Sequence, residues 1–288
     1  MKVLILGAGG LTGRYLVCES KRREMEVVSY TKQELDISKA DIAQDTLANE
    51  KPELVINSAS VTSLELCEEN PVLSRKVNCE APEAWAKECG RAGVRFVHLG
   101  TDYIFDGKKT SAYLPQDLPT PLSRYGKDKA EGEKRVLRAN PHALIVRLAW
   151  VFGHGGKTFM SKLPGILAEK RVVELAGGRT GSCTYAGEAS RIILDLAEKR
   201  VEGIFHGVQA GETTWKRFAE KAIELMKKEG RSVVCEEVRE LSQDKIPGLQ
   251  VPRPAFSTLD ILETERVLGR KIPKWEKGLA EYLKEIGW

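Results

Sequence analysis

The first half of the chain alternates short, mostly apolar runs with longer stretches that carry apolar residues at helical spacing. The apolar runs cover residues 2–6, 26–30, 53–57 and 94–99. Runs of this length are typical of strands that are buried on both faces of a parallel sheet. A helical pattern over residues 71–89 separates the last two of them. Strands and helices in this order predict an α/β fold with a doubly wound parallel sheet.

The pattern changes near residue 150. Four stretches of the second half have the apolar spacing of helices, with short strands between them: residues 157–170, 187–199, 214–229 and 259–268. No low-complexity linker separates the two halves, so the boundary between them is soft. We therefore expect a Rossmann-type domain over residues 1–150 and a smaller, interleaved α/β lobe over residues 151–288, with some segments of the lobe returning to the sheet.

Three glycines follow the first apolar run at regular spacing. Gly7, Gly10 and Gly13 form a GxxGxxG motif between a predicted strand and a predicted helix. Glycine at these positions lets the backbone turn tightly and lets a pyrophosphate lie against the helix N-terminus, where free N–H groups and the helix dipole favour anions. The motif in this place predicts dinucleotide binding, and a purely structural turn is the alternative.

The ends of the second and third predicted strands indicate how a dinucleotide is held. Residues 30–32 offer no carboxylate for a ribose 2′-OH, and Lys32 suits a 2′-phosphate, which favours NADPH over NADH. A solvated loop lysine is the other interpretation. Asp36 is placed to reach the adenine amino group, although Asp36 or Ser38 also suits a helix cap. Small residues over 57–62 leave room for the nicotinamide-side ribose and phosphate.

A further feature combines a phenol, an ammonium and a hydroxyl. Tyr125 and Lys129 are four residues apart at a predicted helix start, so their side chains share one helix face. The pKa of a free tyrosine, about 10, is too high for efficient proton exchange near neutrality, and a neighbouring ammonium lowers it. Thr101, at the end of the fourth strand, is placed to hydrogen-bond a carbonyl oxygen. With the glycine motif, these residues predict proton transfer to a substrate oxygen; alone, Tyr125 and Lys129 would be an ordinary helical pair.

Composition narrows the class of protein. The chain has 288 residues, of which 42% are hydrophobic and 30% charged, enough for a buried core. Its net charge of +4 comes from 45 basic and 41 acidic residues without clustering, which argues against nucleic-acid binding. The six cysteines lack metal-ligand spacing, and no ligand cluster points to a metal. With no signal peptide and no apolar segment near the roughly 20 residues of a membrane span, we expect a cytoplasmic protein without a membrane partner.

Beyond the glycine motif, five segments resemble the motifs of one family. They are Thr101–Gly107 (TDYIFDG), Tyr125–Glu133 (YGKDKAEGE), Arg147–Gly153 (RLAWVFG), Gly203–His206 (GIFH) and Arg253–Asp260 (RPAFSTLD). In this order they resemble the extended short-chain dehydrogenase/reductases, and among these they are most similar to the dTDP-4-dehydrorhamnose reductase family. The matches span nearly the whole chain.

The resemblance implies an NADPH- or NADH-dependent reduction of the C4 ketone of a nucleotide-linked 6-deoxy-4-keto sugar, most similar to the conversion of dTDP-4-dehydrorhamnose to dTDP-rhamnose. It implies that Tyr125 donates the proton, that Lys129 tunes Tyr125 and binds the nicotinamide ribose, and that Thr101 hydrogen-bonds the carbonyl. The cofactor is expected against Gly7, Gly10, Leu11, Thr12, Gly13, Asp36, Ile37, Ala59, Ser60, Val61, Leu99, Tyr125 and Lys129. The nucleotide-sugar substrate is expected against Thr101, Asp102, Trp150 and Arg253, with a mainly substrate-binding lobe over residues 151–288. A homodimer is left open.

The chain departs from the family in one loop of the lobe. Where the family usually has D-Q-x-G-x-P-T, residues 177–184 read GGRTGSCT, so that Arg179 replaces Gln and Cys183 stands at the usual proline. Arg179, Arg253 and Lys274 are candidates for the substrate's pyrophosphate, because arginine suits bidentate phosphate contacts; an ordinary surface charge is the alternative for each. The altered loop leaves the identity of the sugar nucleotide open.

Two other functions on the same scaffold stay open. One is a nucleotide-sugar epimerase or dehydratase, although dehydratases usually carry paired acids after the catalytic threonine and this chain has Asp102 followed by Tyr103. The other is a non-catalytic NADP-binding subunit like the regulatory partner of methionine adenosyltransferase, which resembles the same family. The complete set of Thr101, Tyr125 and Lys129 argues against the second.

Overall fold

A parallel sheet forms the centre of the molecule in this computed structural model, which describes residues 1–39, 41–242, 245–246 and 250–287. Within these ranges the sheet has six strands in the order β10-β5-β4-β3-β1-β2. The strands are β1 (Lys2–Leu6), β2 (Glu26–Tyr30), β3 (Leu54–Asn57), β4 (Arg95–Thr101), β5 (Leu144–Leu148) and β10 (Gly203–His206). Every neighbouring pair is parallel, which confirms the predicted Rossmann-type sheet.

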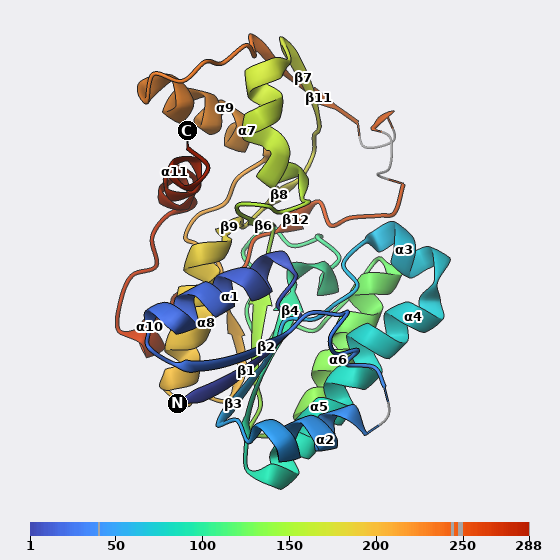
Figure 1. The fold of residues 1–288 in the computed structure, drawn as a ribbon. Coiled ribbons are helices and arrows are strands. Elements are labelled where there is room, and N and C mark those ends of the chain that lie inside the picture. Colours follow the sequence, from blue (N-terminus) through green and yellow to red (C-terminus); the bar gives the residue numbers. More distant parts are fainter. Residues whose placement is uncertain (40, 243–244, 247–249, 288) are drawn as a thin grey trace.

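Helices cover both faces of this sheet (Figure 1). One face packs against α1 (Leu11–Arg22), α8 (Ala186–Glu198) and α10 (Leu262–Leu268), and the other against α2 (Ile42–Glu50), α5 (Ala81–Ala92) and α6 (Arg124–Ala139). Side chains alternate along the strands: Val3 and Ile5 enter the first core, and Leu4 and Leu6 enter the second. Burial on both faces explains the continuous apolar runs of the strands.

The helical pattern over residues 71–89 folds as three consecutive pieces. These are α4 (Pro71–Arg75), a π-helical turn η1 (Lys76–Glu80) and the start of α5, preceded by a short helix α3 (Leu64–Glu69). Asn70 begins α4, because its side chain accepts a hydrogen bond from the Leu73 N–H and Pro71 occupies the first helical position. The π-turn places the Asn78 side chain toward the cleft described below.

A small lobe lies beyond the carboxyl ends of the sheet strands, at the top of Figure 1. We use this name for α7 (Phe159–Glu169), β7 (Val172–Ala176), α9 (Trp215–Lys228), β11 (Glu237–Leu241) and α11 (Trp275–Glu285). Its core is aromatic, with Phe152, Phe218, Trp275 and Tyr282 buried together. Of the range 151–288 that the sequence assigns to the lobe, residues 243–244, 247–249 and 288 lie outside the described residues.

Short strands join the small lobe to the sheet. β6 (Val151–Phe152) pairs with β9 (Thr184–Tyr185), and β8 (Thr180–Gly181) pairs with β12 (Phe256–Ser257). The chain then returns to the sheet, where α8 packs on one face and β10 pairs with β5. The two halves are therefore interleaved along the chain.

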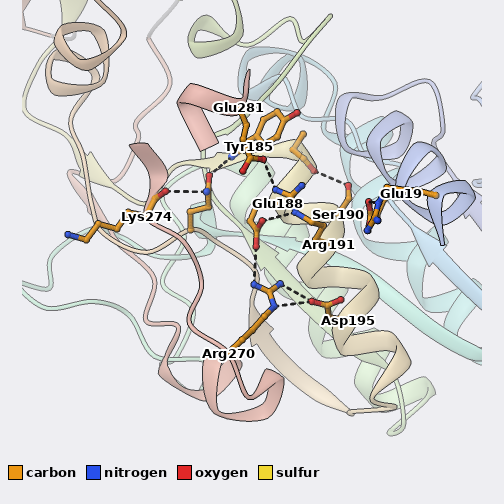
Figure 2. Close-up of polar contacts among 12 residues, drawn as sticks. Glu19, Tyr185, Glu188, Ser190, Arg191, Asp195, Arg270, Lys274 and Glu281 are labelled. Carbon is orange, nitrogen blue, oxygen red and sulfur yellow. Dashed lines mark hydrogen bonds and ion pairs between the residues drawn. The ribbon is translucent and has the colours of Figure 1, made fainter. Parts of the chain in front are cut away.

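Ion pairs fix α8 against later segments of the chain. Figure 2 shows Arg270 between Glu188, at 3.2 Å, and Asp195, at 2.8 Å. Arg191 links Glu188, at 2.7 Å, to Glu281 of α11, at 2.8 Å. Because Glu188 is almost fully buried, these contacts compensate a charge that would otherwise destabilise the fold.

The sequence pattern does not predict α11. Lys274 precedes this helix without a side-chain cap, and Gly278 interrupts it, so the usual start signal and strong helix propensity are missing. Burial decides instead, because Leu279, Tyr282 and Leu283 pack into the core of the small lobe. Among the described residues no helix is both long and apolar enough to cross a membrane.

Candidate active site

A cleft opens at the carboxyl ends of the sheet strands, between the sheet and the small lobe. The loops after β1 and β3, the end of β4 and the first turns of α6 form one side of it. Residues 148–151 and 158–160, with Trp215 of α9, form the opposite side. Ligands of doubly wound sheets bind at this edge, so the cleft is the candidate active site.

The glycine motif makes a close turn at one end of the cleft. Gly7 has a φ of +78°, and a Cβ there would lie 2.6 Å from the Ala59 nitrogen. A Cβ at Gly13 would collide with the carbonyl of Gly7. Helix α1 starts after Gly10 without a side-chain cap, which leaves its first N–H groups available. Gly10, Leu11 and Thr12 line the cleft, whereas Gly7 and Gly13 shape the turn beneath it. These residues fit a dinucleotide pyrophosphate.

Asn78, in the π-helical turn η1, holds the loop after β3 in place. Its side-chain Oδ1 accepts hydrogen bonds from Ser60 Oγ at 2.7 Å and from the Val61 N–H at 2.9 Å, and its Nδ2 donates to the Val61 carbonyl at 2.9 Å. Ala59 and Ser60 line the cleft. Val61 does not; it packs beside Tyr125 in a separate apolar cluster.

Tyr125 lies in the first turn of α6, which begins there because Ser123 caps it with a hydrogen bond from the Gly126 N–H at 3.2 Å. The ring is 7% exposed and meets Tyr103 edge to face at a centroid distance of 6.0 Å. Burial raises the pKa of Tyr125 well above its ordinary value, against the opposing effect of hydrogen bonds with Thr101 and Ser60. Three hydroxyl groups therefore converge at one point of the cleft.

Lys129 lies one turn further along α6, but its ammonium is occupied elsewhere. Its Nζ donates to the Leu99 carbonyl at 2.6 Å and lies 3.0 Å from His98 Nε2. Burial lowers the pKa of Lys129 to about 8. Desolvation of the phenol dominates and raises the pKa of Tyr125 overall, and the influence of Lys129 on Tyr125 stays a prediction.

His98 and Asn57 extend this contact into the core of the sheet. Both side chains are fully buried, and Asn57 Nδ2 lies 3.3 Å from His98 Nδ1. The Ala59 N–H donates to Asn57 Oδ1 at 3.1 Å, which orients the amide so that Nδ2 donates to the imidazole. His98 then carries its proton on Nε2, facing Lys129. A proton on Lys129 and the tautomer of His98 are consequently coupled. Burial holds the pKa of His98 well below its ordinary value, so the ring is neutral.

Thr101 and Asp102 end β4 at the centre of the cleft. Thr101 Oγ1 lies 3.3 Å from Asp102 Oδ1 and accepts from the Tyr103 N–H at 3.3 Å. Asp102 is 1% exposed, and burial raises the pKa of its carboxyl to about 7. Its Oδ2 has no hydrogen-bond partner. Leu99 and Trp150 also line the cleft.

Several predicted site residues lie outside the cleft. Asp36 accepts hydrogen bonds from the backbone and side chain of Ser38, and it does not cap α2, which starts after Asp41. Ile37 is buried in the core beneath Trp85. Lys274 is exposed, and Figure 2 shows it beside the small lobe, where its carbonyl accepts from Gln209.

Arg253 and Arg179 differ in their contacts. Arg253 forms an ion pair with Glu65 of α3 at 2.8 Å and donates to the Val251 carbonyl, so it is not among the cleft-lining residues. Arg179 lies with its guanidinium 4.6 Å from the ring centre of Trp215. It is 6% exposed, and its Nε and Nη2 atoms are buried without a hydrogen-bond partner.

Sequence reasoning missed His98, Asn78 and Trp215 as parts of the site. His98 gives a usable signal, since a polar residue within an otherwise apolar strand of a buried sheet requires a partner. Asn78 and Trp215 lie on predicted helices and give no local signal. Trp215 reaches the cleft only because α9 packs beside α7, where its ring stacks on Phe159 at 4.9 Å.

Similar sequences and the same fold occur in known proteins. The family model described as RmlD substrate binding domain matches residues 1–287. The chain is 32% identical to the spore coat polysaccharide biosynthesis protein SpsK of Bacillus subtilis, over 99% of this chain and 97% of that protein. A solved dTDP-4-dehydrorhamnose reductase of Clostridium acetobutylicum is 28% identical, with a TM-score of 0.92 and 100% of both chains covered. A dTDP-4-dehydrorhamnose reductase of Bacillus anthracis, solved in complex with NADP, is 26% identical, with a TM-score of 0.90 and 99% of each chain covered.

Proposed function

The chain belongs to the RmlD substrate binding domain family, and from that premise we propose that it is an NAD(P)H-dependent oxidoreductase that reduces the C4 ketone of a nucleotide-linked 6-deoxy-4-keto sugar. We propose dTDP-4-dehydrorhamnose as the substrate and dTDP-rhamnose as the product. Two similar solved structures carry the name of that reductase, and one of them is a complex with NADP. The absence of a carboxylate over residues 30–32 supports NADPH as the preferred cofactor.

One observation carries the proposal: a buried phenol and an uncapped, glycine-shaped helix N-terminus border the same cleft. Tyr125 and Thr101 lie at the centre of the cleft, and Gly10, Leu11 and Thr12 lie at its end. The first pair is suited to a carbonyl oxygen and the loop to a pyrophosphate. A reductase must hold the substrate carbonyl and the cofactor close together, so it needs the hydroxyl pair and the glycine loop at one cleft.

The chain's own residues supply the proton and the orientation. When bound, a nicotinamide cofactor supplies the hydride that reaches C4. Tyr125 is protonated in the cleft because burial raises the pKa of its phenol, so it acts as the acid. Its proton passes to the C4 oxygen as negative charge develops there, and the Thr101 hydroxyl donates a second hydrogen bond to that oxygen.

Lys129 stabilises the phenolate that remains after the transfer. With a pKa of about 8, it exchanges a proton near neutral pH. A hydrogen bond to the Leu99 carbonyl holds its Nζ in position beneath the cleft, 3.0 Å from His98 Nε2. Lys129 is thus the group through which Tyr125 is reprotonated between turnovers.

The test is turnover by the purified protein. Given dTDP-4-dehydrorhamnose, the protein should oxidise NADPH faster than NADH and form dTDP-rhamnose, identified by NMR. Tyr125→Phe should reduce kcat by about 100- to 10 000-fold, the usual contribution of a general acid. Tyr113→Phe is the matched control, because Tyr113 is equally buried but stacks on Phe105 away from the cleft. Oxidation of neither cofactor, or an unchanged rate in Tyr125→Phe, would sink the proposal.

A further inference from the structure

Arg179 is a buried cation that the protein does not neutralise. It immediately precedes β8 and lies over Trp215, which lines the cleft. Only 6% of the residue is exposed, and neither Nε nor Nη2 has a hydrogen-bond partner among the described residues. Burial lowers the pKa of the guanidinium, but an arginine stays charged in a protein. An unpaired buried charge destabilises a fold, which makes an anionic ligand the natural partner.

The unpaired edge of Arg179 has the geometry that holds an oxyanion. Elsewhere in this chain the same two atoms of Arg147, Nε and Nη2, donate to Oε2 of Glu133 at 3.0 and 2.9 Å in the buried core. In Arg179 the equivalent two nitrogen atoms have no hydrogen-bond partner among the described residues, and the flat face of the guanidinium lies over Trp215. Both atoms are also closed off from solvent, so an anion reaches them only by displacing the side chains that cover them. The stacked ring fixes the plane of the guanidinium, so its fork is oriented before any ligand arrives.

The position of Arg179 relative to Tyr125 suggests which part of a ligand it meets. Tyr103 lies edge to face against Tyr125, and both Arg179 and Arg253 lie close enough to act electrostatically on the Tyr103 phenol. Arg179 and the proton donor Tyr125 are thus both near Tyr103. In a hexose bound with C4 at Tyr125, C1 lies on the opposite side of the sugar ring, and C1 carries the nucleoside diphosphate.

Arg253 is already paired within the protein, so Arg179 is the arginine that is available to an anion. Both arginines are buried near Tyr103, but Arg253 is already paired with Glu65 at 2.8 Å. Among the described residues Arg179 has no such carboxylate, and it stands where the similar family usually has an uncharged glutamine. This chain therefore adds a full positive charge beside Trp215, which lines the cleft.

We propose that the Nε–Nη2 edge of Arg179, held flat by Trp215, is an anion subsite that binds one phosphate of the substrate's diphosphate. The inference rests on the proposed function for the identity of the ligand, but the subsite can be tested without turnover. It assigns Arg179 to substrate affinity and leaves the chemical step to Tyr125.

The experiment is a titration of the full chain by calorimetry, with NADPH saturating so that the glycine loop is filled. The probes are dTDP, inorganic pyrophosphate, thymidine and glucuronate. Arg179→Gln, which restores the residue usual in the family, should weaken dTDP and pyrophosphate about 10- to 100-fold, as expected for lost hydrogen bonds between charged groups. Thymidine should bind equally to both proteins. Arg179→Lys should be intermediate, because it keeps the charge but loses the fork.

Arg239→Gln is the matched control, since Arg239 is an exposed arginine of the same lobe, paired with Glu237; it should leave all four affinities unchanged. Circular dichroism and an unchanged NADPH affinity establish that each variant is folded. With a turnover substrate, Arg179→Gln should raise KM and leave kcat within about twofold.

Three results would overturn the subsite: no binding of dTDP or pyrophosphate to the wild type, equal affinities in wild type and Arg179→Gln, or an Arg179-dependent affinity for glucuronate alone, which would assign the fork to a sugar carboxylate. If Arg179→Gln weakens dTDP while no 4-keto sugar is reduced, the subsite stands and the proposed function falls. If the 4-keto sugar is reduced but Arg179→Gln binds dTDP as tightly as the wild type, the proposed function stands and the subsite falls.

Discussion

Two buried cations, one from each half of the molecule, differ in what surrounds them: Lys129 lines the cleft, and Arg179 lies against Trp215, which lines it. Lys129 of the sheet half has its Nζ beside His98 Nε2 and the Leu99 carbonyl, at 3.0 and 2.6 Å. Arg179 of the other half has two buried nitrogen atoms without a partner. Both residues are less than 10% exposed, so solvent does not explain the difference.

The contrast separates two tasks. A group that must keep one position through every turnover is held by the protein itself, as Lys129 is. A group that recognises a ligand must leave its donors free, at a cost to stability, until the ligand supplies the acceptors. The cation of the sheet half is therefore already held in position for the chemical step, whereas the donors of the other cation are satisfied only when a ligand binds.

Removing the ammonium of the sheet half should have the largest effect. Lys129→Met should lower kcat by about 100- to 10 000-fold, because the phenolate of Tyr125 loses its stabilising charge. Steady-state kinetics measure it, with Lys127→Met, an exposed lysine of the same helix, as the control. If Lys129→Met instead raises KM at constant kcat, the division of tasks between the two cations is wrong.

Asp102, the buried carboxyl that lines the cleft, should make stability depend on pH. Its folded-state pKa of about 7 is higher than the ordinary value of 3.8, so it favours the folded state below about pH 4 and this contribution is lost as the pH rises to about 7. Relative to wild type, Asp102→Asn should gain stability across that window, by on the order of a few kcal/mol. Urea unfolding at several pH values measures the difference. Asp106→Asn, whose carboxyl has a lowered pKa, should show no such gain.

His98 should matter for the position of Lys129. His98→Leu removes the ring that lies 3.0 Å from the Lys129 Nζ and should reduce kcat about 10- to 100-fold, because the Leu99 carbonyl alone then positions the Nζ. KM should change little. The control is His206→Leu, because His206 is also fully buried in the sheet and bonds the Asp260 carbonyl, remote from Lys129. Equal kcat losses in both variants would mean that His98 acts only through stability.

The smallest effect is expected from Gly181→Ala, a substitution beside Trp150 in the wall of the cleft. A Cβ at Gly181 would lie 2.9 Å from the ring of Trp150 and 2.7 Å from Ser257 Oγ, so Gly181→Ala should displace the indole. We expect a loss of about 1 kcal/mol in the free energy of unfolding and a higher KM at constant kcat. Gly165→Ala, in α7 with open space around it, should stabilise by about 0.5 to 1 kcal/mol. A fall in kcat in Gly181→Ala would show that the wall takes part in the chemical step.

The sheet and the Tyr125, Lys129 pair were predictable because their signals are local. Apolar runs mark strands that are buried on both faces, and a spacing of four residues places two side chains on one helix face. What Lys129 touches was not predictable, because the partners His98 and Leu99 lie on β4, thirty or so residues earlier. That burial raises the pKa of Tyr125 overall could likewise not be predicted from spacing alone.

Other expectations depended on tertiary packing. The side chain of Ile37 is buried in the core near Trp85, which follows from packing rather than from its place after β2, and its contact with the cofactor stays a prediction. Arg179 stood out in the sequence as a departure from a motif. Its Nε and Nη2 atoms lack a hydrogen-bond partner among the described residues because of how the chain packs there, with Trp215 against the guanidinium. No sequence pattern encodes that packing.

The return of the chain to the sheet has a consequence for synthesis on the ribosome. β5 is complete at Leu148, but its neighbour β10 begins only at Gly203, after α7 and most of the strands that join the halves. Until then β5 presents an unpaired edge, which is where nascent chains pair wrongly with one another. A fragment ending near residue 150 would keep that edge permanently, so we expect it to aggregate during expression, whereas the whole chain protects the edge as soon as β10 emerges.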